Sequence, residues 1–179
     1  MSAPAKLPEL MLVIHERLSG AGLDHAFGGA LALAWCTEQA RGTIDLDLNV
    51  FVGPERTDEV LAAVAPGVVA DPEARSLLLS EGQARLLWGS TPVDLFLNTT
   101  EFHKAVSARV RWEPFAGVDL PFLACQDLAV FKALFNRTRD WADLEAMREA
   151  GTLDVPTVIG VLATALGGDD ERIARLRSL

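Results

Sequence analysis

The chain has 179 residues, half of them hydrophobic, with 25 acidic side chains against 16 lysines and arginines. This length supports one domain with a full core, or a small core with a helical appendage, and argues against two independent domains. The net charge of −9 excludes a general basic surface, so nucleic-acid binding would need a local basic edge such as "ARVRW" or "NRTR".

The two cysteines and the first residues bear on the cellular compartment. Cys36 and Cys125 lie in apolar surroundings, and we interpret them as reduced core residues, not as a disulfide framework or a thiolate metal site. The start "MSAPAKLPEL" does not join a basic segment to an apolar one, and the longest apolar stretches are too short to span a bilayer. We expect a cytoplasmic protein without a membrane partner.

The first third of the chain alternates helix and strand. Residues 6–22 carry apolar side chains at helical spacing and end in glycines, which predicts a first helix. Residues 23–29 predict a short strand and residues 30–40 a helix. Residues 44–52 alternate apolar and polar side chains, so we predict a half-buried strand with Ile44, Leu46 and Leu48 in the core.

The rest of the chain predicts two strand pairs and then helices. A short amphipathic helix over 55–67 and a less regular stretch over 68–83 come first. Strand pairs follow over 84–98, with a turn at Gly89 to Pro92, and over 109–123, with a turn at Ala116 and Gly117. From Gln126 onward the pattern is helical, over 127–151, 155–168 and 169–179.

These elements predict an α/β (α+β) fold, a mixed sheet flanked by helices. We expect residues 1–124 to form the core with its N-terminal helix. Residues 125–179 would form a C-terminal helical region packed on that core in a single compact unit.

Two aspartates stand one residue apart in the alternating segment 44–52. Side chains at i and i+2 of a strand point to the same face, about 6.5 to 7 Å apart, so Asp45 and Asp47 form a pair. Carboxylates this close repel each other unless cations lie between them, and hard oxygen ligands suit Mg²⁺. Strand pairing would bring Asp94, in the alternating "TPVDLFLN", beside them. The pattern predicts a divalent metal site of the kind that phosphoryl-type transfer uses.

A glycine pair precedes the acidic strand. Gly28 and Gly29 stand between a predicted strand and a predicted helix, where glycine lets the backbone approach a ligand closely. The N-terminus of the following helix offers free N–H groups and a positive dipole end to phosphate. Followed by a strand with Asp-x-Asp, the pair indicates a phosphate site beside the metal.

The order "FGG", helix, "RGT", "DLDLNV" and "VDLF" resembles the nucleotidyltransferase superfamily typified by DNA polymerase β. The stretch "FKALFNRTRDWADLEAM" is similar to the bacterial AbiEii and MenT type toxin-like nucleotidyltransferases, and the matching residues are Lys132, Arg137, Arg139, Asp140 and Asp143. The resemblance covers Phe27 to Met147. It departs from the family in a longer interval between Gly29 and Asp45, and in Ala30, which supplies no hydroxyl after the glycine pair.

The resemblance implies Mg²⁺-dependent nucleotidyl transfer from an NTP. Asp45 and Asp47 would bind metal, and Asp94 would bind metal or act as the base towards the acceptor hydroxyl. The nucleotide-binding residues would be Gly28 and Gly29 at the triphosphate, Lys132 at a phosphate oxygen, Arg41 and Thr43 at phosphate or beside the acidic pair, and Asp140 at the nucleotide or acceptor. The residues themselves support the role of Lys132, because a cation among Phe131, Leu134 and Phe135 needs an anionic partner.

Each of these residues also has a purely structural explanation. Asp45 and Asp47 could simply lie on the solvated face of an ordinary strand. Asp94 could be an aspartate near a turn, and the glycine pair could form a tight turn. Lys132 fits a side chain that reaches solvent or pairs with Asp127 or Asp140. Loop anchoring explains Arg41 and Thr43, and surface ion pairs at i, i+3 and i+4 explain Arg137, Arg139, Asp140 and Asp143.

Three functions remain open at this point. The first is a toxin-like nucleotidyltransferase that modifies RNA, such as a tRNA end, or a protein hydroxyl, with a cognate antitoxin as partner. The second is an enzyme that modifies a small molecule such as an antibiotic, for which the negative charge suits cationic substrates. The third is a catalytically inactive fold used for binding, against which the three mutually repelling carboxylates argue.

Overall fold

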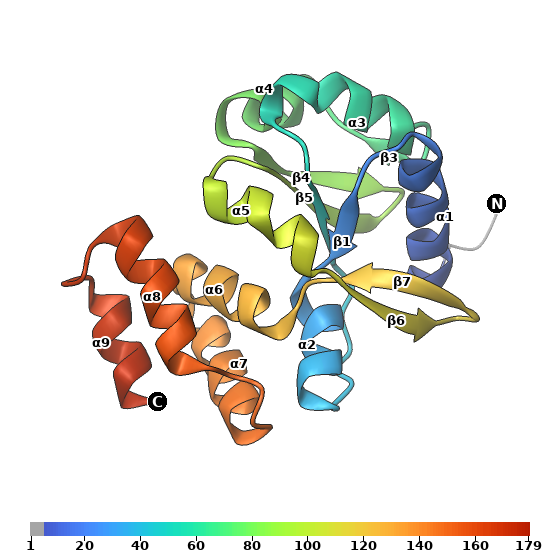
Figure 1. Ribbon diagram of the computed structural model, residues 1–179. Coiled ribbons are helices and arrows are strands. Elements are labelled where there is room, and N and C mark those ends of the chain that lie inside the picture. The colour runs from blue at the N-terminus through green and yellow to red at the C-terminus, as the bar shows by residue number, and fades with distance from the viewer. Residues whose placement is uncertain (1–5) are drawn as a thin grey trace. The chain divides into compact units, whose positions relative to one another are not determined.

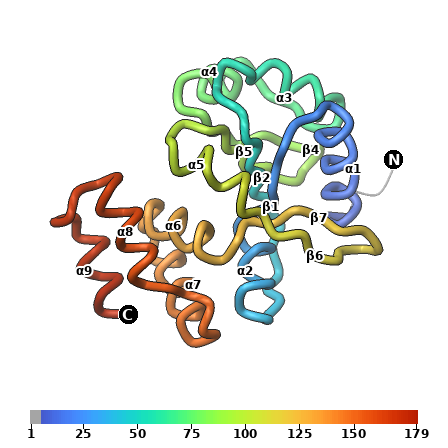
Figure 2. The backbone as a smooth tube through the Cα atoms, viewed as in Figure 1, coloured from blue at the N-terminus to red at the C-terminus, as the bar shows by residue number. Residues whose placement is uncertain are grey.

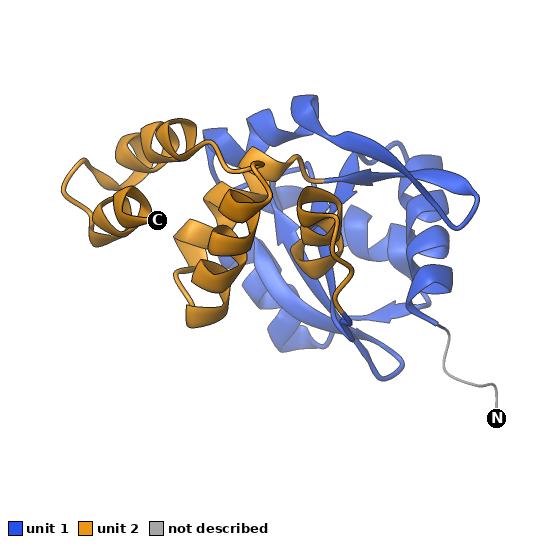
Figure 3. Cartoon of the chain, turned by 90° about the horizontal axis from the view of Figure 1, so that it is seen from below, with its two compact units in different colours: residues 1–28, 42–122 blue, residues 29–41, 123–179 orange. Residues whose placement is uncertain are grey.

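Between residues 6 and 179 the strands form a seven-stranded mixed sheet accompanied by helices, and the predicted mixed sheet flanked by helices is confirmed. The computed structural model describes residues 6–179 (Figure 1). This part of the chain forms two compact units (Figure 3). The first consists of the chain up to Gly28 and residues 42–122, and the second of residues 29–41 and 123–179.

All strands of the described residues belong to the first unit. Their order in the sheet is β3-β4-β5-β2-β1-β7-β6. The pairs β1–β7 and β2–β5 are parallel and the other four are antiparallel, and Figure 2 traces β5, β2 and β1 through the middle of the sheet. The strands are β1 (His25–Phe27), β2 (Leu46–Val50), β3 (Val68–Val69), β4 (Gln83–Trp88), β5 (Thr91–Leu97), β6 (Arg111–Phe115) and β7 (Val118–Phe122).

The helices of the first unit begin and end where the sequence offers caps. In α4, the Asp71 side chain accepts a hydrogen bond from the N–H of Ala74, Pro72 follows, and Gly82 ends the helix with φ +68°. The stretch 68–83, which had no assigned structure, thus contains β3 and α4. The helices are α1 (Leu7–Gly20), the 3₁₀ turn η1 (Pro54–Arg56), α3 (Thr57–Val64), α4 (Pro72–Glu81), α5 (Glu101–Val106) and the 3₁₀ turn η2 (Ser107–Arg109).

The second unit is helical, with α2 (Gly29–Thr37), α6 (Cys125–Phe135), α7 (Thr138–Glu149), α8 (Val155–Leu166) and α9 (Glu171–Ser178). The segment 127–151, predicted as one helical stretch, is interrupted because Asn136 adopts a left-handed φ of +57° and ends α6. Its side chain accepts a hydrogen bond from the indole N–H of Trp141 at 2.7 Å. No helix between residues 6 and 179 is long and apolar enough to cross a bilayer.

The sheet has one apolar face and one face that carries the predicted chemistry. Leu46, Leu48 and Val50 of β2 are buried, and so are the alternate side chains of the neighbouring strands β5 and β4. On the other face, the imidazole of His103 on α5 lies 3.1 Å from the Asn49 side-chain oxygen. The prediction that Ile44 belongs to the core is wrong: β2 begins at Leu46, and Ile44 is 79% exposed.

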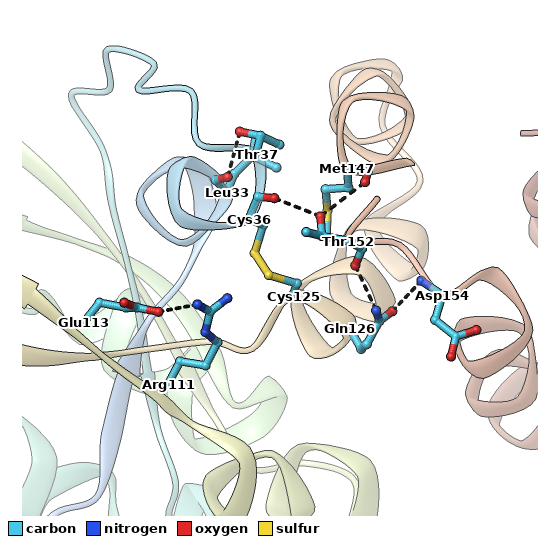
Figure 4. The surroundings of a disulfide bond; sticks show 10 residues. All are labelled: Leu33, Cys36, Thr37, Arg111, Glu113, Cys125, Gln126, Met147, Thr152 and Asp154. Carbon is cyan, nitrogen blue, oxygen red and sulfur yellow. Dashed lines mark hydrogen bonds and ion pairs between the residues drawn. A yellow bond between two sulfur atoms is a disulfide. The ribbon is translucent and has the colours of Figure 1, made fainter. Parts of the chain in front are cut away.

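Both cysteines are buried in the core, as expected, but the interpretation that they are reduced is wrong. Cys36 on α2 and Cys125 on α6 form a disulfide, with their Cα atoms 5.6 Å apart (Figure 4). Beside it, the Thr152 hydroxyl donates to the carbonyl of Cys36 at 2.9 Å. No local pattern indicates this pairing, because the cysteines are 89 positions apart in the sequence and only the packing of α2 against α6 brings them together.

Candidate functional site

The three predicted acidic residues lie on or directly beside two adjacent strands of the first unit. Asp47 on β2 stands directly opposite Asp94 on β5 in the parallel register, so both side chains lie on the same face of the sheet. Asp45 precedes β2 by one residue. The side chains of Asp45 and Asp94 are 28% and 24% exposed, which leaves them accessible from this face.

An arginine that we did not predict for the site joins two of these carboxylates. Arg85 on β4 is the register partner of Asp94. Its guanidinium donates two hydrogen bonds to the Asp94 carboxylate, both at 2.7 Å, and one to Asp45 at 3.3 Å. The hydrogen bonds and charge of Asp94 raise the pKa of Arg85 above its usual value, so the guanidinium stays protonated.

A sequence signal for Arg85 did exist. The hairpin turn at Gly89 and Ser90 pairs Trp88 with Thr91, and this register carries Arg85 to Asp94 three residue pairs further along. Placing the turn at these two residues would have predicted the contact.

The backbone around the acidic strand is held by the predicted loop residues. The N–H of Gly28 donates to the carbonyl of Asp47 at 2.9 Å, which ties the end of β1 to β2. The Thr43 hydroxyl lies 3.2 Å from the N–H of Asp45 and 3.1 Å from its carbonyl. Thr43 therefore fixes the residue that carries one of the three carboxylates.

Gly29 begins α2 with a φ of +55°, in the left-handed region that glycine tolerates without strain. No acidic side chain occupies the first turn of α2. The free N–H groups of that turn and the positive end of the helix dipole remain suited to an anion such as phosphate.

The carboxylates of Asp45, Asp47 and Asp94 in the first unit are of the chemical type that binds a divalent cation. Carboxylate oxygens are the ligands that Mg²⁺ prefers, and a protein cation already bridges Asp45 and Asp94. Within residues 6–179, no three His, Cys, Asp or Glu side chains converge as a ready-made metal site. The Arg85 guanidinium instead contacts the carboxylate oxygens that a metal would need.

The other predicted binding residues with charged side chains belong to the second unit and form a buried ion-pair network. The Lys132 ammonium lies 2.6 Å from an Asp143 oxygen and 3.8 Å from Asp140. Arg41 donates two hydrogen bonds to Asp143, at 2.6 and 3.2 Å. Arg137 pairs with Asp140 at 2.7 Å. The chief anionic partner of Lys132 is therefore Asp143, which we did not predict, and Asp140, which we named as a structural partner, lies further away.

The interpretation of these aspartates as surface ion pairs is wrong. The side chains of Asp140 and Asp143 are 1% and 3% exposed, whereas Arg137 is exposed and pairs with Asp140 at i, i+3. Burial by itself raises the pKa of Asp143, but hydrogen bonds and charges from Arg41 and Lys132 outweigh it and lower this pKa below its usual value. Asp143 is thus held as a buried carboxylate.

A hollow of about 380 Å³ lies at the opposite end of β1 and β2 from the acidic residues. Asp24, His25 and Phe51 line it, whereas Gly28 and Asp47 belong to the other end of these strands. We assign the candidate site to the acidic cluster because its carboxylates have a defined chemistry.

Comparison with known proteins bears on the fold. No protein-family model matches the sequence, and no curated protein matches it. Among solved structures, the solution structure of the antibiotic-resistance factor ANT(2'')-Ia covers 96% of this chain and 89% of that chain, with a TM-score of 0.57 and 17% identity. The crystal structure of ANT(2'')-Ia with adenylyl-2''-tobramycin covers 96% and 94%, with a TM-score of 0.54 and 16% identity.

A third structure is that of an antigenic nucleotidyltransferase-like protein from Paracoccidioides brasiliensis, with a TM-score of 0.49, 14% identity, and coverage of 98% of this chain and 95% of that chain. The two structures above 0.5 agree with the mixed sheet and flanking helices described here. The chain has a nucleotidyltransferase-like fold.

Proposed function

We propose that this protein is a Mg²⁺-dependent nucleotidyltransferase that moves a nucleoside monophosphate from an NTP to an acceptor hydroxyl. One observation supports the proposal most: carboxylates from two adjacent strands, in register at Asp47 and Asp94 and joined through Arg85 to Asp45, share one accessible face of the sheet. Such a set binds a hard cation and handles a proton, which are the two needs of phosphoryl-type transfer.

In the proposed reaction, the acceptor oxygen forms a bond to the α-phosphorus of the NTP. The bond between that phosphorus and the bridging oxygen breaks, and pyrophosphate leaves with its electron pair. The acceptor proton goes to a carboxylate, for which Asp94 is the proposed base. No other reactant is required.

The residues of the chain have separate tasks in this proposal. Asp45 and Asp47 would hold the divalent ion, and Asp94 would either join them as a ligand or act as the base. The ion would neutralise phosphate charge and favour ionisation of the acceptor hydroxyl. The Thr43 hydroxyl bonds the backbone of Asp45, and the N–H of Gly28 donates to the backbone carbonyl of Asp47, so both residues are held in place. Gly29 opens the helix whose N–H groups suit the triphosphate.

We propose RNA, such as a tRNA end, or a protein hydroxyl as the acceptor. This choice rests on the similarity of residues 131–147 to the toxin-like nucleotidyltransferases, and it carries with it a cognate antitoxin as partner and a cytoplasmic location, where NTPs are abundant. A disulfide is more typical of an oxidising compartment. Trapping of thiols in fresh cell lysates would report its state in the cell.

A small cationic molecule is the second candidate acceptor. The net charge of −9 favours a cation, and the structural neighbour ANT(2'')-Ia is described as an antibiotic-resistance factor and was solved with adenylyl-2''-tobramycin. Growth on an aminoglycoside would separate this candidate from the first, because only an enzyme that modifies the drug rescues growth.

The test is a labelled-NTP assay with Mg²⁺ against total RNA, proteins and a panel of cationic drugs. We expect one acceptor class to take up label, and Asp45→Asn and Asp47→Asn to reduce transfer at least about 100-fold, because each loses a charged metal ligand. Asp58→Asn is the matched control, since Asp58 pairs with Arg75 on the exposed surface outside the site.

Two results contradict the proposal in different ways. If the wild-type protein transfers no label and binds neither NTP nor Mn²⁺ in calorimetry, the proposed enzymatic activity is wrong. If both Asp variants transfer label as well as the wild type does, the protein is an enzyme, but Asp45 and Asp47 are not its metal ligands.

A further inference from the structure

Arg85 is a cation that contacts two of the three proposed metal ligands, Asp45 and Asp94. Its guanidinium engages both oxygens of Asp94 at 2.7 Å and one oxygen of Asp45 at 3.3 Å. These contacts come from three strands or strand ends that the sheet register sets side by side, because β4 pairs with β5 and β5 with β2. The guanidinium therefore binds the same carboxylate oxygens that a divalent ion would bind.

Arg85 binds Asp94 through two hydrogen bonds, but its side chain is exposed, so a metal ion could displace it. Two parallel N–H···O bonds to one carboxylate give the strongest geometry available to arginine. The side chain is nevertheless 57% exposed, whereas Asp45 and Asp94 are 28% and 24% exposed. Exposed ion pairs contribute little net free energy, so a long side chain at the rim can move to solvent at small cost.

We propose that Arg85 is a built-in competitor of the divalent metal, which occupies the carboxylates of Asp45 and Asp94 in the metal-free protein and is displaced when the metal binds. The proposal rests on the proposed function, because it takes these carboxylates as metal ligands. It assigns Arg85 two effects: it neutralises the repelling acidic residues when no metal is present, and it weakens metal binding in the absence of nucleotide.

The competition has a physical basis in charge. A divalent ion must remove the guanidinium from the carboxylates before it can use their oxygens, so its apparent affinity falls by the strength of the ion pair that is lost. Arginine keeps its charge at all accessible pH values, so the competitor cannot be removed by titration. The released guanidinium stays on β4 at the rim of the acidic cluster, where the oxygens of a triphosphate are suitable new partners.

The test measures binding of Mn²⁺ alone to the full chain, by calorimetry and by the electron paramagnetic resonance signal of free Mn²⁺, without nucleotide. We expect Arg85→Gln to bind Mn²⁺ about fivefold more tightly than the wild type, because the loss of the charge frees two carboxylates from an exposed ion pair. Arg85→Lys keeps a cation and should stay within about twofold of the wild type. Arg75→Gln is the matched control, since Arg75 makes the same two-bond contact with Asp58 away from the site.

The melting temperature is a second measurement, and it shows whether Arg85→Gln is folded. Without metal, Arg85→Gln should have a lower melting temperature than the wild type, and saturating Mn²⁺ should raise it by more than it raises that of the wild type or of Arg75→Gln. A melting transition that is cooperative without metal confirms that the variant is folded before the affinities are compared.

The outcomes separate this inference from the function on which it rests. Measurable Mn²⁺ binding that is equal or weaker in Arg85→Gln overturns the competition and leaves the proposed function intact. Equal tightening in Arg85→Lys and Arg85→Gln overturns the role of charge. Absence of Mn²⁺ binding in the wild type and in every variant overturns the metal site itself, and the proposed function with it.

Discussion

Lys132 shows how single charged residues are placed in the second unit. Its side chain is 7% exposed, and the Asp143 carboxylate at 2.6 Å matches its charge. A buried ammonium without such a partner would cost several kcal/mol. From the sequence we expected an anionic partner, but the partner is 11 residues away on another helix, and Arg41 reaches the same carboxylate from 102 residues away.

Replacement of Lys132 by Met tests this network. The change keeps most of the length of the side chain but leaves the buried Asp143 and Asp140 without the ammonium, so we expect the free energy of unfolding to fall by about 3–5 kcal/mol. Urea denaturation measures the loss. Lys104→Met is the control, because Lys104 pairs with Glu101 on the surface and should change stability by less than about 1 kcal/mol. Equal effects of the two substitutions would show that the buried network does not stabilise the protein.

The passage from α4 into β4 shows what fixes an element in place. Gly82 ends α4 with φ +68°, its N–H donates to the Leu78 carbonyl at 3.1 Å, and its own carbonyl accepts from the N–H of Leu97 at 2.7 Å. These bonds set the start of β4 against β5. They therefore set the register that brings Arg85 to Asp94.

Gly82→Ala should destabilise the protein more than Gly89→Ala. Both glycines have positive φ, which costs alanine about 1–2 kcal/mol. At Gly82 a methyl group would also overlap the Thr99 methyl group, whereas at Gly89 no atom lies within 4 Å of the added carbon. We expect a loss of about 1 kcal/mol for Gly89→Ala and at least about 2 kcal/mol for Gly82→Ala in urea denaturation. Equal losses would mean that Thr99 moves aside without cost.

Most elements could be predicted from the sequence, because their periodicity and turns are local. The two strand pairs over 84–98 and 109–123 are confirmed, with the second turn at Ala116 and Gly117 as predicted. Local signals were too weak at β3, which has two residues, and at Asn136, where one left-handed residue divides the helical segment 127–151. The strand β3 depends on pairing with β4, about 20 positions further along the chain, whereas Asn136 is bonded to Trp141 five positions on.

At the scale of the whole molecule, stability depends on pH through buried histidines. Burial lowers the pKa of His25 and His103 from 6.5 to about 4. Both rings are therefore neutral in the folded protein at neutral pH. The unfolded chain binds more protons than the folded chain between these two values, so folding is favoured fully above pH 6.5 and loses stability as pH falls towards 4.

We expect the free energy of unfolding to decrease by up to about 1.4 kcal/mol per pH unit for each of these histidines between pH 6.5 and 4. His25→Gln and His103→Gln should each make this slope shallower by the contribution of one proton, whatever their effect on stability at pH 7. Urea denaturation at several pH values gives the slopes. A slope that neither substitution changes would show that the histidines do not carry the pH dependence.

The sequence by itself determined the local elements of this protein and the chemistry of its acidic pattern, because alternation, glycine turns and residue types act over a few positions. It predicted the mixed fold, and it placed Asp47 and Asp94 on strands that the structure shows to be neighbours, whereas Asp45 lies one residue before its strand. The roles of Asp45, Asp47 and Asp94 in binding metal stay predictions.

Only the tertiary structure decided which distant residues meet. It brought Arg85 to Asp45 and Arg41 to Asp143, and it joined Cys36 to Cys125. It also showed that Ile44 is exposed, since β2 starts two residues later than the alternation indicated. The reason is physical: sheet register and helix packing set contacts between segments tens of residues apart, and no local pattern in the chain records them.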